Sequence, residues 1–98
     1  MSYSITFSER AFSELLDSWA WYEDRQDGLG DEFKKVVFRK LAQVAVNPEI
    51  GTPKKRSYYE ITIKRFPYIV IYRIEKRSKT VFVSSLFHTS RAPKNKYK

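Results

Sequence analysis

Residues 68–75 read Tyr-Ile-Val-Ile-Tyr-Arg-Ile-Glu, the most apolar stretch of the chain, and they decide the fold. A run this rich in β-branched and aromatic residues predicts a central strand covered on both faces. Phe66-Pro67 predicts a corner before this strand, and the residues 76–78 predict a short turn after it. Apolar and polar residues alternate in 58–65, and a further strand is expected in 80–88. The second half of the chain therefore predicts three consecutive strands.

The first half predicts one strand and two helices. Residues 2–7 alternate as a strand does, and Ser8 can cap the helix that follows. That helix extends to Asp27-Gly28, and a second extends from Leu29 or Asp31 to Asn47-Pro48, where the residue before proline disfavours helix. Apolar residues at helical spacing form a stripe on each helix that is expected to face the core: Phe12, Leu15, Leu16, Trp19 and Tyr22 on the first, and Phe33, Val36, Val37, Leu41, Val44 and Ala45 on the second.

The element order β-α-α-β-β-β predicts an α+β fold. Only three or four residues separate the helices, so they are expected to form an antiparallel hairpin. The economical packing places this hairpin on one face of a mostly antiparallel four-stranded sheet. Residues 48–57 read as an exposed loop. With 98 residues in all, the whole chain, 1–98, is expected to form a single domain.

The charge is strongly positive and unevenly distributed. The chain holds 19 Lys and Arg against 11 Asp and Glu, a formal net charge of +8. Residues 1–32 contain two bases and eight acids, whereas residues 33–98 contain seventeen bases and three acids. A basic second half favours polyanionic or acidic partners. It does not distinguish nucleic acid from an acidic protein segment.

Several classes of function are excluded or disfavoured by composition. The chain has no cysteine and one histidine, so disulfides, thiol nucleophiles and a dedicated metal site are not expected, and no motif indicates a cofactor. Neither a signal peptide nor an apolar run of membrane-spanning length is present in the sequence. We therefore expect a cytoplasmic protein with no membrane partner.

The remaining candidates for chemistry are cations and one imidazole. A phosphodiester-cleaving site without metal needs an acid, a base and cations that hold the phosphorane charge. His88 is the candidate acid or base, and the candidate cations are Lys64, Arg65, Arg73 and Arg91. The structural alternative is that His88 and Arg91 serve only packing and surface pairing. Basic residues interleaved with tyrosines, such as Lys54, Lys55, Arg56 and Tyr58, would also suit phosphate contacts with some stacking.

The chain resembles the RelE/ParE superfamily of toxins from bacterial toxin–antitoxin modules over essentially its whole length. The resemblance rests on a strand leading into Ser8-Glu9-Arg10-Ala11, the helical hairpin, and Asn47-Pro48 with Gly51. It also rests on residues 65–73, Arg-Phe-Pro-Tyr-Ile-Val-Ile-Tyr-Arg, and on the ending His88-Thr89-Ser90-Arg91-Ala92-Pro93. The Phe-Pro-Tyr signature resembles the ParE-like branch.

The resemblance implies a growth-inhibiting toxin that a cognate antitoxin neutralises through an acidic, apolar C-terminal segment, in a hetero-oligomer of the two. RelE-like members cut messenger RNA in the ribosome, and ParE-like members block DNA gyrase without cleaving anything. RelE-like nucleases commonly carry an arginine where this chain has Ile69, and losing that cation costs about 3 kcal/mol of transition-state stabilisation. Binding of gyrase is therefore the leading hypothesis, ahead of a ribosome-dependent endoribonuclease and of an inactive scaffold that only binds an antitoxin.

Contacts with the antitoxin or the target are expected from nine residues: Lys54, Lys55, Arg56, Tyr58, Arg65, Arg73, His88, Arg91 and Lys94.

Overall fold

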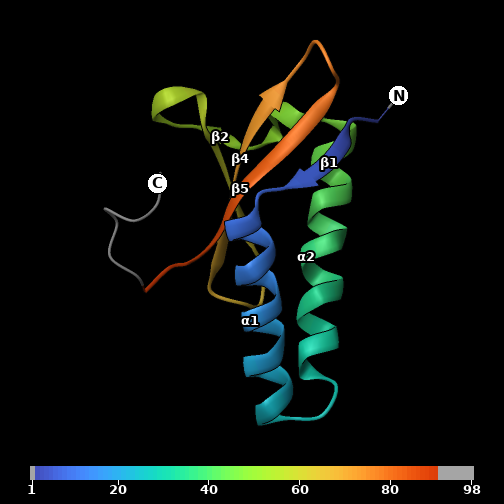
Figure 1. The fold of residues 1–98 in the computed structure, drawn as a ribbon, viewed down its shortest axis with the longest axis vertical. Helices are drawn as coiled ribbons and strands as arrows, with labels where there is room; N and C mark the ends of the chain where they lie inside the picture. Colours follow the sequence, from blue (N-terminus) through green and yellow to red (C-terminus); the bar gives the residue numbers. More distant parts are fainter. Residues whose placement is uncertain (1, 91–98) are drawn as a thin grey trace.

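The computed structural model describes residues 2–90 of the chain, and its ribbon is drawn in Figure 1. The helices are α1 (Glu9–Arg25) and α2 (Leu29–Val46), and short 3₁₀ turns span Pro48–Ile50 and Lys55–Ser57. The strands are β1 (Ser4–Phe7), β2 (Thr52–Pro53), β3 (Tyr59–Ile63), β4 (Tyr68–Glu75) and β5 (Thr80–His88). The α+β class and the predicted element order are confirmed.

The sheet has the order β1-β5-β4-β3-β2, which places β4 at its centre as predicted. The pair of β1 with β5 is parallel, and the other three pairs are antiparallel. The predicted number of four strands is wrong, because the two residues of β2 pair with β3 at the far edge. Two residues carry too little alternation to be recognised as a strand in sequence.

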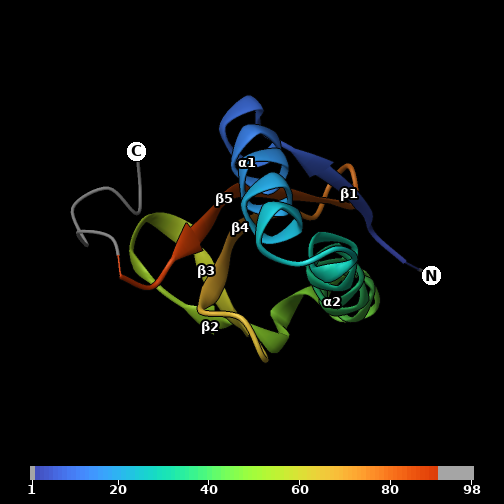
Figure 2. The same ribbon diagram turned by 90° about the horizontal axis from the view of Figure 1, so that it is seen from below.

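Local capping explains where the helices begin. The Ser8 hydroxyl oxygen accepts a hydrogen bond from the backbone N–H of Ala11 at 2.9 Å, as an N-cap does. Only residues 26–28 separate the two helices, which lie side by side (Figures 1 and 2). The Glu23 carboxylate accepts hydrogen bonds from the N–H groups of Gly28 and Gly30 at 2.8 and 2.9 Å. It thereby satisfies two donors at the start of α2.

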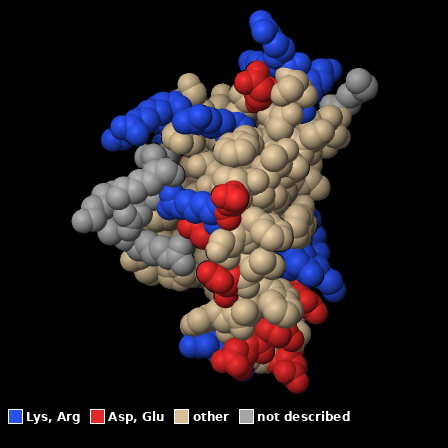
Figure 3. Space-filling view, in the orientation of Figure 1, with Lys and Arg blue, Asp and Glu red and all other residues tan. Residues whose placement is uncertain are grey.

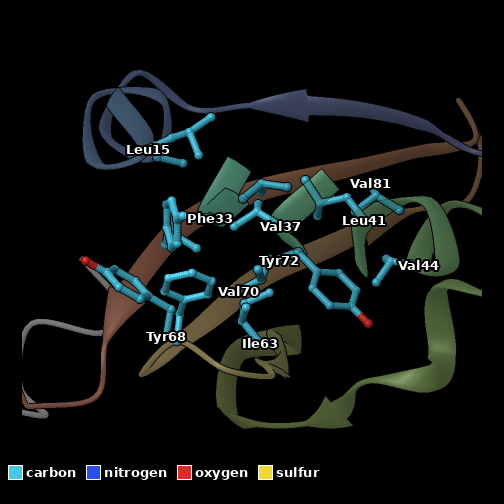
Figure 4. Packing of buried hydrophobic residues seen from close by; sticks show 14 residues of the cluster. Leu15, Phe33, Val37, Leu41, Val44, Ile63, Tyr68, Val70, Tyr72 and Val81 are labelled. Carbon is cyan, nitrogen blue, oxygen red and sulfur yellow. The ribbon is translucent and has the colours of Figure 1, made fainter. Parts of the chain in front are cut away.

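The core lies between the hairpin and one face of the sheet. Leu15 of α1 and Phe33, Val37 and Leu41 of α2 meet the alternate β4 residues Val70 and Tyr72 (Figure 4). The opposite face of β4 carries a second, smaller cluster, in which Tyr58, Ile71 and Phe87 are buried and Ile69 packs against them. Because both faces are covered at its centre, β4 has the uniformly apolar sequence from which its position was predicted.

Three residues of the predicted α1 core stripe are not in the core, and one of them, Trp19, is half-buried. Phe12 is 53% exposed and Leu16 is 50% exposed, whereas Ala11, Leu15 and Ser18 are buried. Successive helical residues turn by about 100°, so Phe12 and Leu16 lie on one flank of the buried arc. The helix packs through Ala11, Leu15 and Ser18, and the predicted apolar stripe is wider than the part of the helix that meets the core.

The predicted loop 48–57 is only partly exposed. Pro48 and Gly51 are buried, and the Tyr72 hydroxyl donates to the Pro48 carbonyl at 2.7 Å. The same hydroxyl oxygen accepts from the Gly51 N–H at 3.1 Å. Burial raises the pKa of Tyr72 to about 12. Tyr72 thus ties the segment after α2 to the central strand, and the rest of the loop, residues 49–50 and 52–57, is exposed.

Candidate functional site

The basic loop, residues Lys54, Lys55 and Arg56, lies between β2 and β3, and all three side chains are exposed. Arg56 and Ser57 have φ of 60° and 66°, a left-handed conformation that non-glycine residues rarely adopt. The Lys54 N–H donates to the Tyr58 carbonyl at 2.7 Å and closes the turn. The turn therefore presents three cations at the edge of the sheet.

Arg73 and Tyr58 form a pair on the sheet face that the helices do not cover, which we call the open face. An Arg73 guanidinium N–H donates to the Tyr58 hydroxyl at 3.0 Å, and Cζ lies 4.5 Å from the ring centroid. Tyr58 is itself buried with Ile71 and Phe87. The predicted binding residues Tyr58, which follows the basic loop, and Arg73 of β4 are thus brought together. This arrangement holds one guanidinium in place and suits recognition of anionic or acidic groups.

His88 lies away from Arg73. In the sheet His88 pairs with Tyr68, whereas Arg73 pairs with Phe82, five residues further along β4 and about 16 Å away. The odd spacing on β4 also places the two side chains on opposite faces. Accordingly the His88 ring meets the core residue Tyr68 edge to face, with centroids 5.0 Å apart. The structure therefore does not assemble the predicted set in which His88 and Arg73 share one phosphate.

A bulge in β5 determines the face on which His88 lies. Ile71 pairs with Ser85 and Tyr72 pairs with Val83, so Ser84 is an extra residue in β5. One inserted residue reverses the faces of all residues that follow it. Phe82, before the bulge, pairs with Arg73 on the open face, and His88, after it, lies on the helix face.

Lys64 and Arg65 occupy the turn between β3 and β4, where both lie beside residues of α2. Arg65 has φ of 76° and its guanidinium binds the Glu32 carboxylate of α2 at 2.9 Å. This hydrogen bond lowers the pKa of Glu32. Lys64 borders a small cavity of about 170 Å³ with Arg39 and Lys40 of α2. Neither residue is placed with the Tyr58–Arg73 pair, and Arg91 and Lys94 lie outside the described residues.

Ile69 is half-buried on the open face, where it packs against the cluster of Tyr58, Ile71 and Phe87. A branched aliphatic side chain therefore occupies the position at which RelE-like nucleases are expected to carry an arginine.

Glu60, which sequence reasoning did not single out, lies on the same face of the sheet as Tyr58 by alternation, and its side chain is 8% exposed. The feature that marks Glu60 as a candidate site residue is the burial of its charged side chain, and burial cannot be read from the sequence.

Sequence reasoning also missed an exposed apolar surface on the hairpin. Phe12 and Leu16 lie one turn apart on α1, and Phe38 of α2 is 44% exposed with its ring 6.1 Å from that of Phe7. Figure 3 shows acidic residues gathered at the lower end, where the helices join, basic residues at the upper end, and mostly uncharged residues with a few charged ones between them. Large apolar side chains left exposed on two adjacent helices favour a contact with another protein.

Two further classes of site were searched for in residues 2–90. No group of three or more His, Cys, Asp or Glu residues in this range could hold a metal ion. Neither helix of the described chain has the length and apolarity that a membrane crossing requires.

Comparisons with known proteins agree with the fold. A sequence model of the ParE toxin of type II toxin–antitoxin systems, parDE, matches residues 5–93. A chain of the chromosomal ParDE system from P. aeruginosa superimposes with a TM-score of 0.70 at 15% identity, covering 89% of this chain and 96% of that one. No curated protein sequence matches.

Two E. coli structures are more similar in sequence. A chain of the intact RelBE toxin–antitoxin complex is 26% identical with a TM-score of 0.61, covering 92% of this chain and 100% of that one. A RelE mutant in complex with a RelB antitoxin peptide is 26% identical with a TM-score of 0.64, and the match covers 88% of this chain and 82% of that one.

Proposed function

The chain belongs to the ParE toxin family of type II toxin–antitoxin systems, and we propose that it arrests growth by binding DNA gyrase. The observation that carries this proposal is the separation of His88 from the Tyr58–Arg73 pair. An imidazole that lies about 16 Å along the sheet from Arg73, on the opposite face, cannot transfer a proton at a phosphate that Arg73 holds. The geometry of the open face thus favours a toxin that binds its target without cleaving it.

The target surface in this proposal consists of the basic loop and Arg73. The loop cations are exposed, so an acidic surface can reach them, and Arg73 is held by Tyr58, so its binding costs little side-chain freedom. Binding through such charges steers association and weakens as salt is added. The same positive charge suits the acidic part of an antitoxin.

We propose further that the apolar part of the cognate antitoxin covers Phe12, Leu16 and Phe38. These side chains lie on the hairpin, outside the open face, and are about half exposed. Covering them removes apolar surface from water at about 25 cal/mol per Å². An antitoxin segment that spans both surfaces would occupy the target-binding cations while it buries the hairpin, which is a physical route to neutralisation.

A supercoiling assay with purified gyrase and relaxed plasmid tests the proposal. The wild-type protein should inhibit, and Arg73→Ala should require about tenfold more protein for the same inhibition. Arg77→Ala, which removes the same charge from the turn between β4 and β5, is the matched control and should inhibit as the wild type does. Absence of inhibition by the wild-type protein at high concentration would refute the proposal.

The second candidate function is ribosome-dependent cleavage of messenger RNA, which is favoured by the 26% identity with RelE-containing structures against 15% with the ParDE system. In this alternative His88 acts as acid or base. Ribosome-bound message should then be cut by the wild-type protein and spared by His88→Ala. Intact message with the wild-type protein would exclude the alternative.

A further inference from the structure

A cavity opens where α1 passes the end of β5 and the turn between β3 and β4. Its volume is about 490 Å³, and residues from all three segments line it, among them Asp17, Trp21, Tyr22, Tyr68 and His88. It lies on the helix side of the sheet, whereas the Tyr58–Arg73 pair lies on the open face. The cavity is therefore distinct from the proposed gyrase surface and has the size of a binding site for a small group.

The walls of the cavity are aromatic rings in mutual contact. Trp21 and Tyr22 meet edge to face at 5.0 Å, Tyr22 and Tyr68 at 6.4 Å, and Tyr68 and His88 at 5.0 Å. The His88 Nδ1 accepts a hydrogen bond from the Ser90 N–H at 3.1 Å, which orients the imidazole. The rings thus form a continuous frame of π-faces and edges around one opening.

The charge of the cavity is opposite to that of the molecule. Asp17 is the one acid among the lining residues, and no Lys or Arg of residues 2–90 lines the cavity. Within residues 2–90, no hydrogen bond or ion pair engages the Asp17 carboxylate. An unpaired carboxylate beside aromatic rings matches the chemistry that recognises an organic cation.

Trp21 already binds an organic cation within the chain, the guanidinium of Arg25. The Arg25 guanidinium carbon lies 3.4 Å from the centroid of the Trp21 ring, and Trp21 remains 51% exposed. A guanidinium prefers this stacking because it is planar and more weakly hydrated than an ammonium ion. The same indole that lines the cavity therefore binds one cation on the helix surface.

From these observations we infer that the cavity receives an arginine side chain of the cognate antitoxin, an inference that rests on the antitoxin contact proposed above. Phe12 and Leu16 lie on one flank of α1, and Asp17 and Trp21 lie on the other. A helix is about 10 Å across, so three or four extended residues of a segment covering the first flank reach the second. Arginine complements both Asp17 and the rings, whereas an acidic side chain would be repelled by Asp17.

The chemistry of the cavity can be tested on the purified full-length chain with N-acetyl-arginine methylamide, followed by the two tryptophan indole N–H resonances in NMR spectra. The Trp21 resonance should shift saturably, and that of Trp19, which donates to Asp31 at 2.9 Å, should not. N-acetyl-citrulline methylamide, a neutral compound of nearly the same shape, should bind at least about fivefold more weakly. Equal binding of the two compounds, or no shift at Trp21, would overturn the inference.

The antitoxin assignment is tested on the complex. Asp17→Asn should release the cognate antitoxin about fivefold faster than the wild-type chain does. Asp24→Asn removes an acid from the same helix outside the cavity and should leave the rate unchanged. If the arginine compound binds but Asp17→Asn releases the antitoxin at the wild-type rate, another partner fills the cavity and the assignment is wrong. Failure to inhibit gyrase would refute the proposed function and leave these results unaffected.

Discussion

Replacement of Tyr72 by phenylalanine removes one hydroxyl from the best-buried tyrosine of residues 2–90. That hydroxyl donates to the Pro48 carbonyl at 2.7 Å and accepts from the Gly51 N–H at 3.1 Å. Tyr72→Phe therefore loses two hydrogen bonds and leaves two buried backbone groups without a partner. An unsatisfied buried group costs about 1–3 kcal/mol, so we expect the free energy of unfolding to fall by about 3 kcal/mol at neutral pH.

The loss of unfolding free energy in Tyr72→Phe should become smaller at alkaline pH. Burial raises the pKa of Tyr72 to about 12 in the folded chain, against an ordinary value of 10.0. Between these values the folded chain keeps a proton that the unfolded chain has released, so the wild-type protein loses stability as pH rises. Phenylalanine has no such proton. The difference between the two proteins should therefore narrow by about 2–3 kcal/mol as pH rises through 10 toward 12.

Urea unfolding followed by circular dichroism at several pH values measures both effects. Tyr59→Phe is the matched control, because Tyr59 stacks on Tyr72 at 5.5 Å but its hydroxyl makes no hydrogen bond within residues 2–90. The control should lose less than about 1 kcal/mol and show no such dependence on pH. An equal loss in both variants, or a difference between wild-type and Tyr72→Phe that is constant with pH, would refute the reasoning.

Three further predictions concern the hairpin. Glu14→Ala leaves two β5 donors, each 2.9 Å from the Glu14 carboxylate, without an acceptor, and urea unfolding should show a loss of about 2–3 kcal/mol. Gly30→Ala would place a methyl group 2.5 Å from a backbone carbonyl oxygen of α1, and its unfolding midpoint should drop by an amount equivalent to about 1–3 kcal/mol. The double change of Phe12 and Leu16 to aspartate should weaken the cognate antitoxin about 100-fold by calorimetry, with unchanged circular dichroism because both side chains are half exposed. Antitoxin affinity equal to that of the wild type would disprove the hairpin contact.

The candidate site was predictable in part. The basic loop, Tyr58 and Arg73 were named among nine candidate binding residues, and only the structure shows that Tyr58 and Arg73 are in contact. His88 was grouped with Arg73 in the nuclease hypothesis, and the structure separates them. Five residues of β4 account for the distance between them, and the extra residue Ser84 accounts for the opposite faces, because a bulge reverses the faces of the residues after it and leaves no periodic signal before the register is known.

The sequence by itself determined the local structure of this protein. The Ser8 cap, the breaks at Gly28 and Pro48, and the apolar run of β4 are properties of neighbouring residues, and hydrogen bonds between neighbours enforce them. Fold class and element order followed, because few packings bury one hairpin against three strands.

Tertiary structure decided which side chains face each other, the core or the solvent. The bulge that turns His88 away from Arg73, the exposure of Phe12 and Leu16, and the unpaired carboxylate at the aromatic cavity all depend on contacts between segments far apart in the chain. Glu14 binds β5 across 71 and 72 residues of sequence. Such pairings are fixed by the packing of the whole core, and no local pattern of residues encodes them.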